Sequence, residues 1–358
     1  MKYTFEIKKT TTPKQKPNPD NLMFGREFTD HMFVMDYSPE KGWHNGQIVP
    51  YGPIPLDPAA SVLHYGQELF EGMKAYRTPS GDVQLFRPYK NAERLNSSSD
   101  RLCMPFMDTE LFVSAVKALV DLDRDWIPEK EGTSLYLRPF TFSTDPFLGV
   151  RASDTYKFVI ICSPVGPYYN TPGGGILPTK IYVEEDYVRA VVGGVGAAKA
   201  GGNYAASMKA QHLAAEKGCD QVLWLDAIEH SFVEEIGASN VFFVIDDEVI
   251  TSPLTGTILP GITRDSVIAL LKKWGVKISE RKLRISEVVK AAEEGRLKEA
   301  FGTGTAAVIA PVATFMFKDR SITVGNGGVG ELALKLYNTL YGIQNGTIQD
   351  DMGWVEMI

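Results

Sequence analysis

The chain has 358 residues and is poor in several residue types that carry common functions. Its three cysteines, Cys103, Cys162 and Cys219, show no CxxC or zinc-ligand spacing, and its five histidines show no ligand spacing either. We therefore expect reduced thiols and no metal site. The formal net charge is −7 and no block of lysine and arginine stands out. This balance argues against a nucleic-acid partner, which usually requires a basic stripe.

Long apolar runs are also missing. The longest nearly apolar stretch, Ala306–Phe317, contains Pro311 and is far shorter than the roughly 20 residues that cross a bilayer. The first residues, Met1–Lys9, lack the apolar core of a signal peptide. Apolar residues make up 44% of the chain and charged residues 23%, which is typical of a globular protein. We predict a cytoplasmic protein with no membrane partner.

Proline and glycine divide the chain into two parts. Residues 1–20 are polar and rich in lysine and proline, and they predict an extended arm. Three prolines and four glycines fall in Ser163–Gly175, too many for the interior of a helix or strand. We therefore predict one domain over residues 1–163, a linker over 164–177 and a second domain over 178–358.

Hydrophobic periodicity and turn residues predict the elements within these parts. We expect a hairpin over 75–86 with its turn at 78–81; further strands at 134–138, 156–162, 180–183, 221–225 and 241–245; and helices at 89–101, 109–123, 205–217, 261–274 and 331–343. The helix at 205–217 is expected to bury Ala206, Ala210, Leu213 and Ala214.

The most informative stretch is Val191–Tyr204, which places Lys199 among five glycines in otherwise small or apolar company. Desolvation favours the neutral amine of a lysine, and a neutral amine attacks carbonyl carbons to form a Schiff base. Glycines also leave room for a flat ligand. The alternative is a flexible surface loop with a solvated lysine, since glycine-rich loops are common.

Two further stretches fit a ligand at this lysine. In Ile258–Ser266, Gly261 precedes a predicted helix, so the N–H groups of Ile262 and Thr263 would suit a phosphate; a simple turn is the alternative. In Phe232–Asn240, the adjacent acids Glu234 and Glu235 lie in an apolar segment. If this segment is a strand, only one acid faces the core and needs a partner such as a protonated ring nitrogen, whereas the alternative is an exposed pair.

A lysine for a Schiff base, a phosphate-binding helix start and an acid for a ring nitrogen are together the requirements of pyridoxal 5'-phosphate. A rival motif is Gly325–Gly330, which fits GxGxxG and precedes a helix. A dinucleotide site needs a βαβ unit around those glycines, and the tail Gly346–Trp354 is a poor central strand. We expect a surface turn there rather than the site of a nicotinamide-dependent oxidoreductase.

Several ordered segments resemble the signatures of branched-chain amino-acid aminotransferases. They are Leu69–Tyr76, Leu85–Pro88, Lys199–Tyr204, Gly218–Leu225, Glu235–Asn240, Leu259–Arg264 and Gly302–Ala306. The resemblance extends from about Phe24 to the end of the chain, and it implies an α/β (α+β) fold of type IV: a small α/β domain, a larger barrel-like domain and an active site between them. The cofactor implied is pyridoxal 5'-phosphate.

The resemblance also implies the roles of individual residues. Lys199 matches the lysine that holds the cofactor and moves the substrate proton, Glu235 matches the acid at the ring nitrogen, and Tyr204 matches the tyrosine at the ring's phenolic oxygen. Arg94 matches the phosphate-binding arginine, whose guanidinium fork suits that task. The remaining cofactor contacts implied are Leu259, Gly261, Ile262, Thr263 and Thr305. The substrate contacts implied are Phe28, Tyr65, Phe70, Tyr136, Arg138, Tyr168, Thr305 and Ala306.

The reaction implied is a two-step exchange between amino acids and 2-oxo acids: L-leucine, L-isoleucine or L-valine donates its amino group, and 2-oxoglutarate accepts it. Tyr136 and Arg138 alternate on a strand and so share a face, where the family accepts glutamate's side-chain carboxylate. Ala307 and Ala310 stand where some animal members carry a redox CxxC, so we expect no thiol switch. A D-amino-acid aminotransferase and an aminodeoxychorismate lyase, which belong to the same fold group, are the alternatives. We expect a homodimer or higher homo-oligomer.

Overall fold

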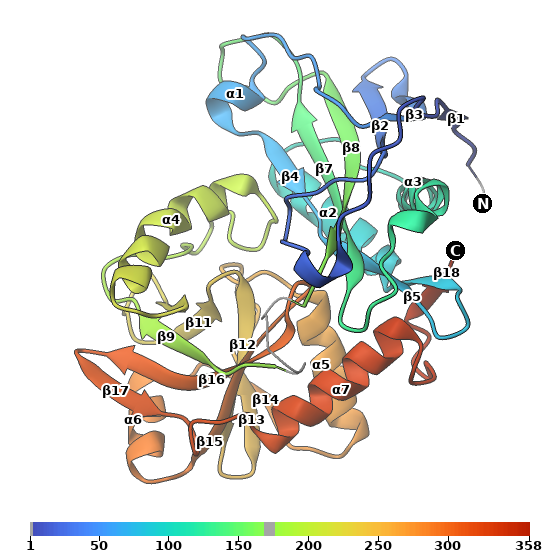
Figure 1. Cartoon of the computed structure of the whole chain (residues 1–358). Helices are drawn as coiled ribbons and strands as arrows, with labels where there is room; N and C mark the ends of the chain where they lie inside the picture. Colours follow the sequence, from blue (N-terminus) through green and yellow to red (C-terminus); the bar gives the residue numbers. More distant parts are fainter. Residues whose placement is uncertain (1–2, 168–175) are drawn as a thin grey trace. The chain divides into compact units, whose positions relative to one another are not determined.

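The computed structural model describes residues 3–167 and 176–358, and the chain forms two compact units (Figure 1). Unit 1 comprises Met1–Tyr168, Ala198–Gly201 and Gly342–Ile358. Unit 2 comprises Tyr169–Ala197 and Gly202–Tyr341. Much of the predicted linker, 164–177, lies outside the described residues, and the predicted domain boundaries stay a prediction.

Unit 1 is built on one mixed sheet. The strand order is β1-β3-β2-β8-β7-β5-β6-β18, and β4 pairs with β7 beside this path. The strands are β1 (Glu6–Ile7), β2 (His31–Ser38), β3 (Gly42–Pro50), β4 (Glu68–Phe70), β5 (Met73–Arg77), β6 (Val83–Phe86), β7 (Ser134–Ser143), β8 (Tyr156–Val165) and β18 (Val355–Met357). The helices are α1 (Val62–Tyr65), α2 (Pro88–Arg101) and α3 (Thr109–Leu122), with 3-10 turns at Pro19–Asn21 and Arg124–Trp126.

The local sequence signals of unit 1 form the elements that they predict. The hairpin pairs Ala75 with Leu85, and its turn closes through the N–H of Gly81 and the carbonyl of Thr78 at 2.9 Å. Helix α3 is capped by the Asp108 carboxylate, which accepts the Glu110 N–H at 2.7 Å. Its apolar face then packs into the main core of the unit.

Two strands of unit 1 are longer than predicted, and both contain a proline. Strand β7 continues to Ser143 through Pro139, whose carbonyl accepts the Glu71 N–H at 2.7 Å. Strand β8 continues to Val165 through Pro164, which lies opposite Leu135. A proline removes one donor but keeps its carbonyl, so these strands persist where sequence rules end them.

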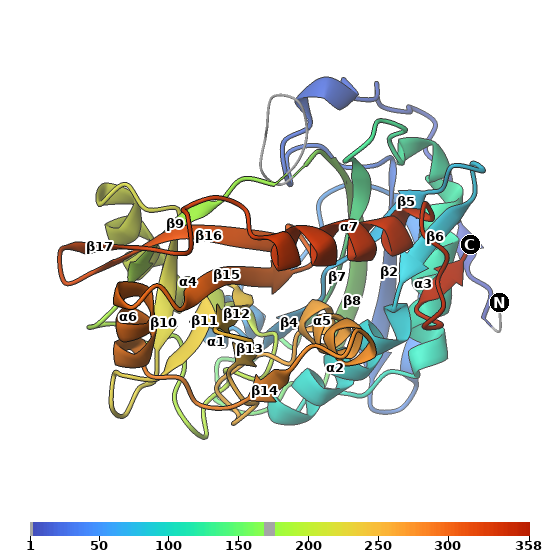
Figure 2. The ribbon, with the colours of Figure 1, turned by 90° about the horizontal axis from the view of Figure 1, so that it is seen from below.

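Unit 2 contains a closed barrel. Among the described residues, the strands β11-β10-β9-β16-β15-β12 pair in this order, and β12 also pairs with β11, which closes a ring of six. Strands β9, β16 and β15 lie side by side in Figure 2. The interior is filled by residues such as Ile181, Leu223, Val241 and Phe243, with Phe243 stacked on Phe315 at 5.8 Å.

The elements of unit 2 have the following bounds. The strands are β9 (Thr179–Val183), β10 (Gln221–Leu225), β11 (Val233–Ile236), β12 (Ser239–Ile245), β13 (Glu248–Thr251), β14 (Ile278–Glu280), β15 (Leu297–Gly304), β16 (Val308–Phe317) and β17 (Arg320–Thr323). The helices are α4 (Gly201–Glu216), α5 (Ile262–Lys273), α6 (Ile285–Glu293) and α7 (Glu331–Asn345). In the described part of the chain, no helix is long and apolar enough to cross a membrane.

Helix α4 differs from the prediction in its start and in its buried face. It begins at Gly201, four residues before the predicted start at Ala205, and the Gly201 N–H is bound by Glu68 of strand β4. Its buried positions are Asn203, Ser207, Ala210 and Ala214. Ala206 is exposed and Leu213 is half-buried, so the predicted apolar face was wrong at these two positions.

Candidate active site

The backbone of Lys199 is fixed on both sides by other elements of unit 1. Its N–H donates to the Ser98 hydroxyl of α2 at 3.0 Å, and its carbonyl accepts the Phe70 N–H of β4 at 3.1 Å. The next residue, Ala200, pairs with Leu69 across a short antiparallel bridge. Lys199 is therefore held at a defined point, two residues before helix α4 begins.

The start of helix α4 is held from the same strand. The Glu68 carboxylate accepts a hydrogen bond from the Gly201 N–H, and burial, opposed by this bond and by Arg138, raises the pKa of Glu68. A Cβ at Gly201 would lie 1.7 Å from a Glu68 oxygen, so any other residue here would displace this carboxylate from its present position. Strand β4 thus holds three successive residues, from Lys199 to Gly201.

The Lys199 amine lies among groups that change its proton affinity. Burial lowers its pKa to about 8; the Arg94 charge lowers it further, Glu71 and Tyr136 oppose the shift, and Arg138 adds to it. The amine also lies 4.6 Å from the centre of the Phe70 ring. The neutral, nucleophilic form of this amine is therefore more populated at a given pH than in an ordinary lysine, and it becomes substantial at mildly alkaline pH.

A low pKa alone does not single out Lys199. Burial also lowers the pKa of Lys74 on β5 to about 8, and the sequence analysis did not anticipate this second amine. The two lysines differ in their position in the fold. Lys199 directly precedes a helix that carries a further predicted contact, Tyr204, in its first turn.

The predicted phosphate-binding residue Arg94 forms a buried two-pronged ion pair in unit 1. Its Nε and Nη2 atoms donate to the two oxygens of Glu71 at 2.8 and 2.7 Å, and Glu71 is fully buried. Asn91 donates a further bond to Glu71 at 2.8 Å. This geometry fixes the guanidinium plane. Sequence reasoning missed Glu71 and Asn91; an acid inside the apolar run Leu69–Met73 was the available signal.

The predicted carboxylate-binding pair also occurs in unit 1. Tyr136 and Arg138 lie on one face of β7, and Arg138 Nη2 donates to the Tyr136 hydroxyl at 3.0 Å. The Arg138 guanidinium lies 4.5 Å from the Phe70 ring centre, so Phe70 contacts both Arg138 and the Lys199 amine. The structure therefore brings together Phe70, Arg94, Tyr136, Arg138 and Lys199.

Two predicted wall residues, Phe28 and Tyr65, have partners outside this group. Phe28 stacks on Tyr51 with ring centres 5.0 Å apart, and Tyr65 is 45% exposed with its hydroxyl donating to the Leu148 carbonyl. Tyr168 lies outside the described residues. The substrate roles of these three residues stay predictions.

In unit 2 both acids lie on strand β11 and both are buried, so the alternative of an exposed pair is wrong. Glu235 is 2% exposed and Glu234 is 7% exposed. Glu235 forms an ion pair with Arg189 at 2.6 Å and accepts a bond from the Asn240 amide at 2.8 Å. The segments that follow β10 and β13 cover the other face of β11. A side chain on that face can therefore also be buried, although neighbouring strand residues point to opposite faces.

Asn240 connects three of the predicted cofactor contacts. Its amide group donates to Glu235 and, at 2.9 Å, to the carbonyl of Leu259. A Cβ on Gly261 would lie 1.9 Å from the Asn240 oxygen, so Gly261 is required for this close approach. Arg189 extends the same network, since it also donates to the carbonyls of Gly196 and Thr257. Sequence reasoning missed Arg189 as a functional residue.

Helix α5 offers free donors at its N-terminus. Gly261 caps it without a side-chain bond, and within the described residues nothing accepts from the N–H groups of Ile262 and Thr263. The helix dipole adds positive potential there. These donors suit a phosphate, as predicted. Thr305 and Ala306, the predicted carboxylate contacts, occupy the turn between β15 and β16.

The donor sets therefore fit pyridoxal phosphate: a buried amine of lowered pKa, a fixed arginine, a buried carboxylate and an uncapped helix start. The amine and the arginine belong to unit 1, and the carboxylate and the helix start belong to unit 2.

The rival dinucleotide motif, Gly325–Gly330, does not fit a dinucleotide site. The N–H groups of Leu332 and Ala333, at the start of α7, both donate to the Glu299 carboxylate at 2.9 Å, which fills the position of a pyrophosphate. The next strand, β18, pairs antiparallel with β6 and makes no βαβ unit.

Comparison with known proteins identifies the family. The family described as Amino-transferase class IV matches residues 68–315. The chain belongs to this family. It is 57% identical over 353 residues to branched-chain-amino-acid aminotransferase 2 of Bacillus subtilis (strain 168), covering 99% of this chain and 96% of that protein.

Solved structures agree with the fold of this class IV aminotransferase. The branched-chain amino acid aminotransferase of Escherichia coli superimposes with a TM-score of 0.76 at 26% identity, covering 91% of this chain and 98% of that one. The branched-chain aminotransferase of the thermophilic archaeon Thermoproteus uzoniensis, solved with norvaline, gives a TM-score of 0.74 at 25% identity, covering 91% and 99%. The predicted fold type and the barrel-like domain are thus confirmed.

Proposed function

We propose that this aminotransferase transfers the amino group of L-leucine, L-isoleucine or L-valine to 2-oxoglutarate, giving a branched-chain 2-oxo acid and L-glutamate. The observation that carries the proposal is the placement of Lys199, a buried amine of pKa about 8 held between α2 and β4 beside Phe70 and Arg94. The likeness to branched-chain aminotransferases over nearly the whole chain supports the substrate class.

Pyridoxal 5'-phosphate, when bound, supplies an electron sink for the carbanion formed at the substrate Cα. The chain's own residues then have separate tasks. Lys199 would hold the cofactor covalently and would move the proton at the substrate Cα. Glu235, kept in place by Arg189 and Asn240, would accept a hydrogen bond from the protonated ring nitrogen. Tyr204 would bind the phenolic oxygen, and Leu259 would pack against the ring.

Phosphate binding uses Arg94, whose orientation Glu71 fixes, together with the N–H groups of Ile262 and Thr263, the Thr263 hydroxyl and Thr305. Gly261 allows the close approach at the helix start.

Substrate binding uses an apolar wall and two sets of polar groups. Phe70, with Phe28, Tyr65 and Tyr168, forms the wall, and Thr305 and Ala306 hold the α-carboxylate. Tyr136 and Arg138, which are bonded to each other, bind the second carboxylate of glutamate. This arrangement explains how one pocket takes both an aliphatic and an acidic substrate.

We further propose that the enzyme works in the cytoplasm as at least a homodimer. The cysteines Cys103, Cys162 and Cys219 are all unpaired, which suits a reducing compartment. The resemblance to branched-chain aminotransferases implies an assembly in which neighbouring subunits close each other's sites. Sedimentation equilibrium measures the mass directly.

The test of the reaction is the visible spectrum of the purified holoenzyme before and after L-leucine. Covalently held cofactor absorbs in the visible, and transfer of the amino group removes that band. Lys199→Ala should lose the band and turnover while remaining folded, whereas Lys209→Ala, an exposed position of α4, should keep both. A band that ignores L-leucine but responds to D-alanine would instead favour a D-amino-acid aminotransferase.

A further inference from the structure

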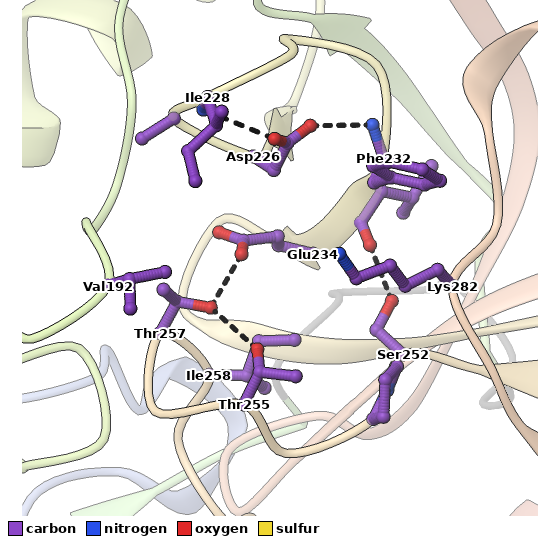
Figure 3. A pocket seen from close by; sticks show the side chains of 13 residues that line it. Val192, Asp226, Ile228, Phe232, Glu234, Ser252, Thr255, Thr257, Ile258 and Lys282 are labelled. Carbon is purple, nitrogen blue, oxygen red and sulfur yellow. Dashed lines mark hydrogen bonds between the residues drawn. The ribbon is translucent and has the colours of Figure 1, made fainter.

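A second pocket in unit 2 lies apart from the residues assigned above. It is formed by the turn after β10, the segment after β13, and Val192, and it encloses a cavity of about 90 Å³ that opens to solvent (Figure 3). Glu234 lies at its centre. Neighbouring strand residues point to opposite faces, so this carboxylate is separated by β11 from Glu235.

The Glu234 carboxylate has one satisfied oxygen and one unsatisfied oxygen. Oε1 accepts the Thr257 hydroxyl at 2.5 Å, and Oε2 is buried without a partner among the described residues. Figure 3 shows one oxygen directed to Thr257 and the other directed away from it. A buried charged oxygen without a donor is costly, and burial accordingly raises the pKa of Glu234, against the Thr257 bond.

None of the described residues supplies the missing donor. Lys282 reaches into the pocket, but its amine lies 4.8 Å from the Phe232 ring centre and forms no ion pair with Glu234 in the described structure. Asp226, the other acid of the pocket, is saturated. Burial would raise its pKa, but bonds from four backbone N–H groups outweigh this and lower it to about 2.

The charge and the walls of the pocket define the ligand. The charges of Arg189 and Lys282 both act on Glu234, but among the described residues neither forms an ion pair with it, so its unsatisfied oxygen can accept from a bound ammonium. The walls are aliphatic: Val192 is 66% exposed, Ile228 is 77% exposed and Ile258 is buried. Large exposed aliphatic side chains beside an unsatisfied buried acid are typical of a small-molecule site.

We propose that this pocket binds a small aliphatic primary ammonium compound, with the ammonium on Glu234 and the aliphatic group against Val192 and Ile228. Two sources share this chemistry: a simple amine and an apolar amino acid in its zwitterionic form. The Lys282 ammonium distinguishes them, because it meets a carboxylate only in the amino acid. The proposal does not depend on the transamination reaction, since none of its residues belongs to the catalytic groups.

The test is calorimetric titration with isobutylamine and with L-valine. It uses holoenzyme treated with borohydride, which fixes the cofactor to the protein and keeps substrates from reacting there. Binding should weaken about tenfold or more in Glu234→Gln, because a charge-assisted bond is lost. Glu229→Gln, an exposed acid in the same turn, is the matched control and should leave the affinity unchanged.

Two variants make the outcome specific. Ile228→Ser changes only an exposed wall, so it should fold normally and weaken isobutylamine but not methylammonium. Lys282→Ala should weaken L-valine if the source is an amino acid and leave isobutylamine unaffected. The proposal is overturned if neither isobutylamine nor L-valine binds. It is also overturned if Glu234→Gln and Ile228→Ser both bind isobutylamine as tightly as the parent protein does. In either case the free oxygen of Glu234 bonds only to water.

Discussion

At the scale of single residues, the candidate site depends on groups that orient other groups. Lys199 is positioned by Ser98 and Phe70, and Glu71 fixes the guanidinium of Arg94. Arg189 and Asn240 do the same for Glu235. The reacting groups carry recognisable sequence signatures. The residues that orient the reacting groups lack such signatures, because each of them is recognised only by its contact with a residue that is distant in the sequence.

The Lys199 amine should show its lowered pKa when apo-protein reacts with pyridoxal phosphate. Only the neutral amine attacks, so the rate of covalent attachment should rise with pH and level off with a midpoint at about 8. Stopped-flow absorbance measures this rate. A midpoint near the ordinary lysine value of 10.5 would mean that the amine is solvated and that the burial argument is wrong.

At the scale of elements, glycines decide how closely the segments of the site approach one another. Gly261 lets α5 begin against Asn240, and Gly201 lets α4 begin against Glu68. Gly202, one residue further along, has no atom within 4 Å of its Cβ position. The same residue type therefore has a steric role at two positions and none at the third.

Alanine at Gly261 and at Gly202 should have opposite effects. Gly261→Ala forces Asn240 away from Glu235 and Leu259, and we expect a loss of about 1–3 kcal/mol in the free energy of unfolding together with weaker cofactor retention. Gly202→Ala adds helix propensity in open space and should be neutral or stabilising by up to about 1 kcal/mol. Urea unfolding and dialysis measure these effects, and equal losses in the two variants would refute the steric explanation.

At the scale of the whole molecule, periodicity and turn residues predicted most elements, and the resemblance predicted the barrel. The errors have physical causes. Strands β7 and β8 pass through Pro139 and Pro164 because only one ladder bond is lost at each. Glu234 is buried because loops cover the outer face of β11, which no local pattern records. Glu71 was missed because its partners are 20 and 23 residues away, so its role depends on tertiary structure.

The two units also bury separate hydrophobic clusters, and this has a measurable consequence. Phe112 belongs to the cluster of unit 1 and Phe315 to that of unit 2, and the two clusters share no residue. Each is fully buried, so Phe→Leu at either position should cost about 1–2 kcal/mol through lost contacts and a small cavity. Because the two positions have no common partner, the double variant should lose the sum to within about 0.5 kcal/mol. Urea unfolding followed by circular dichroism tests this, and a clear departure from the sum would mean that the two cores are energetically coupled.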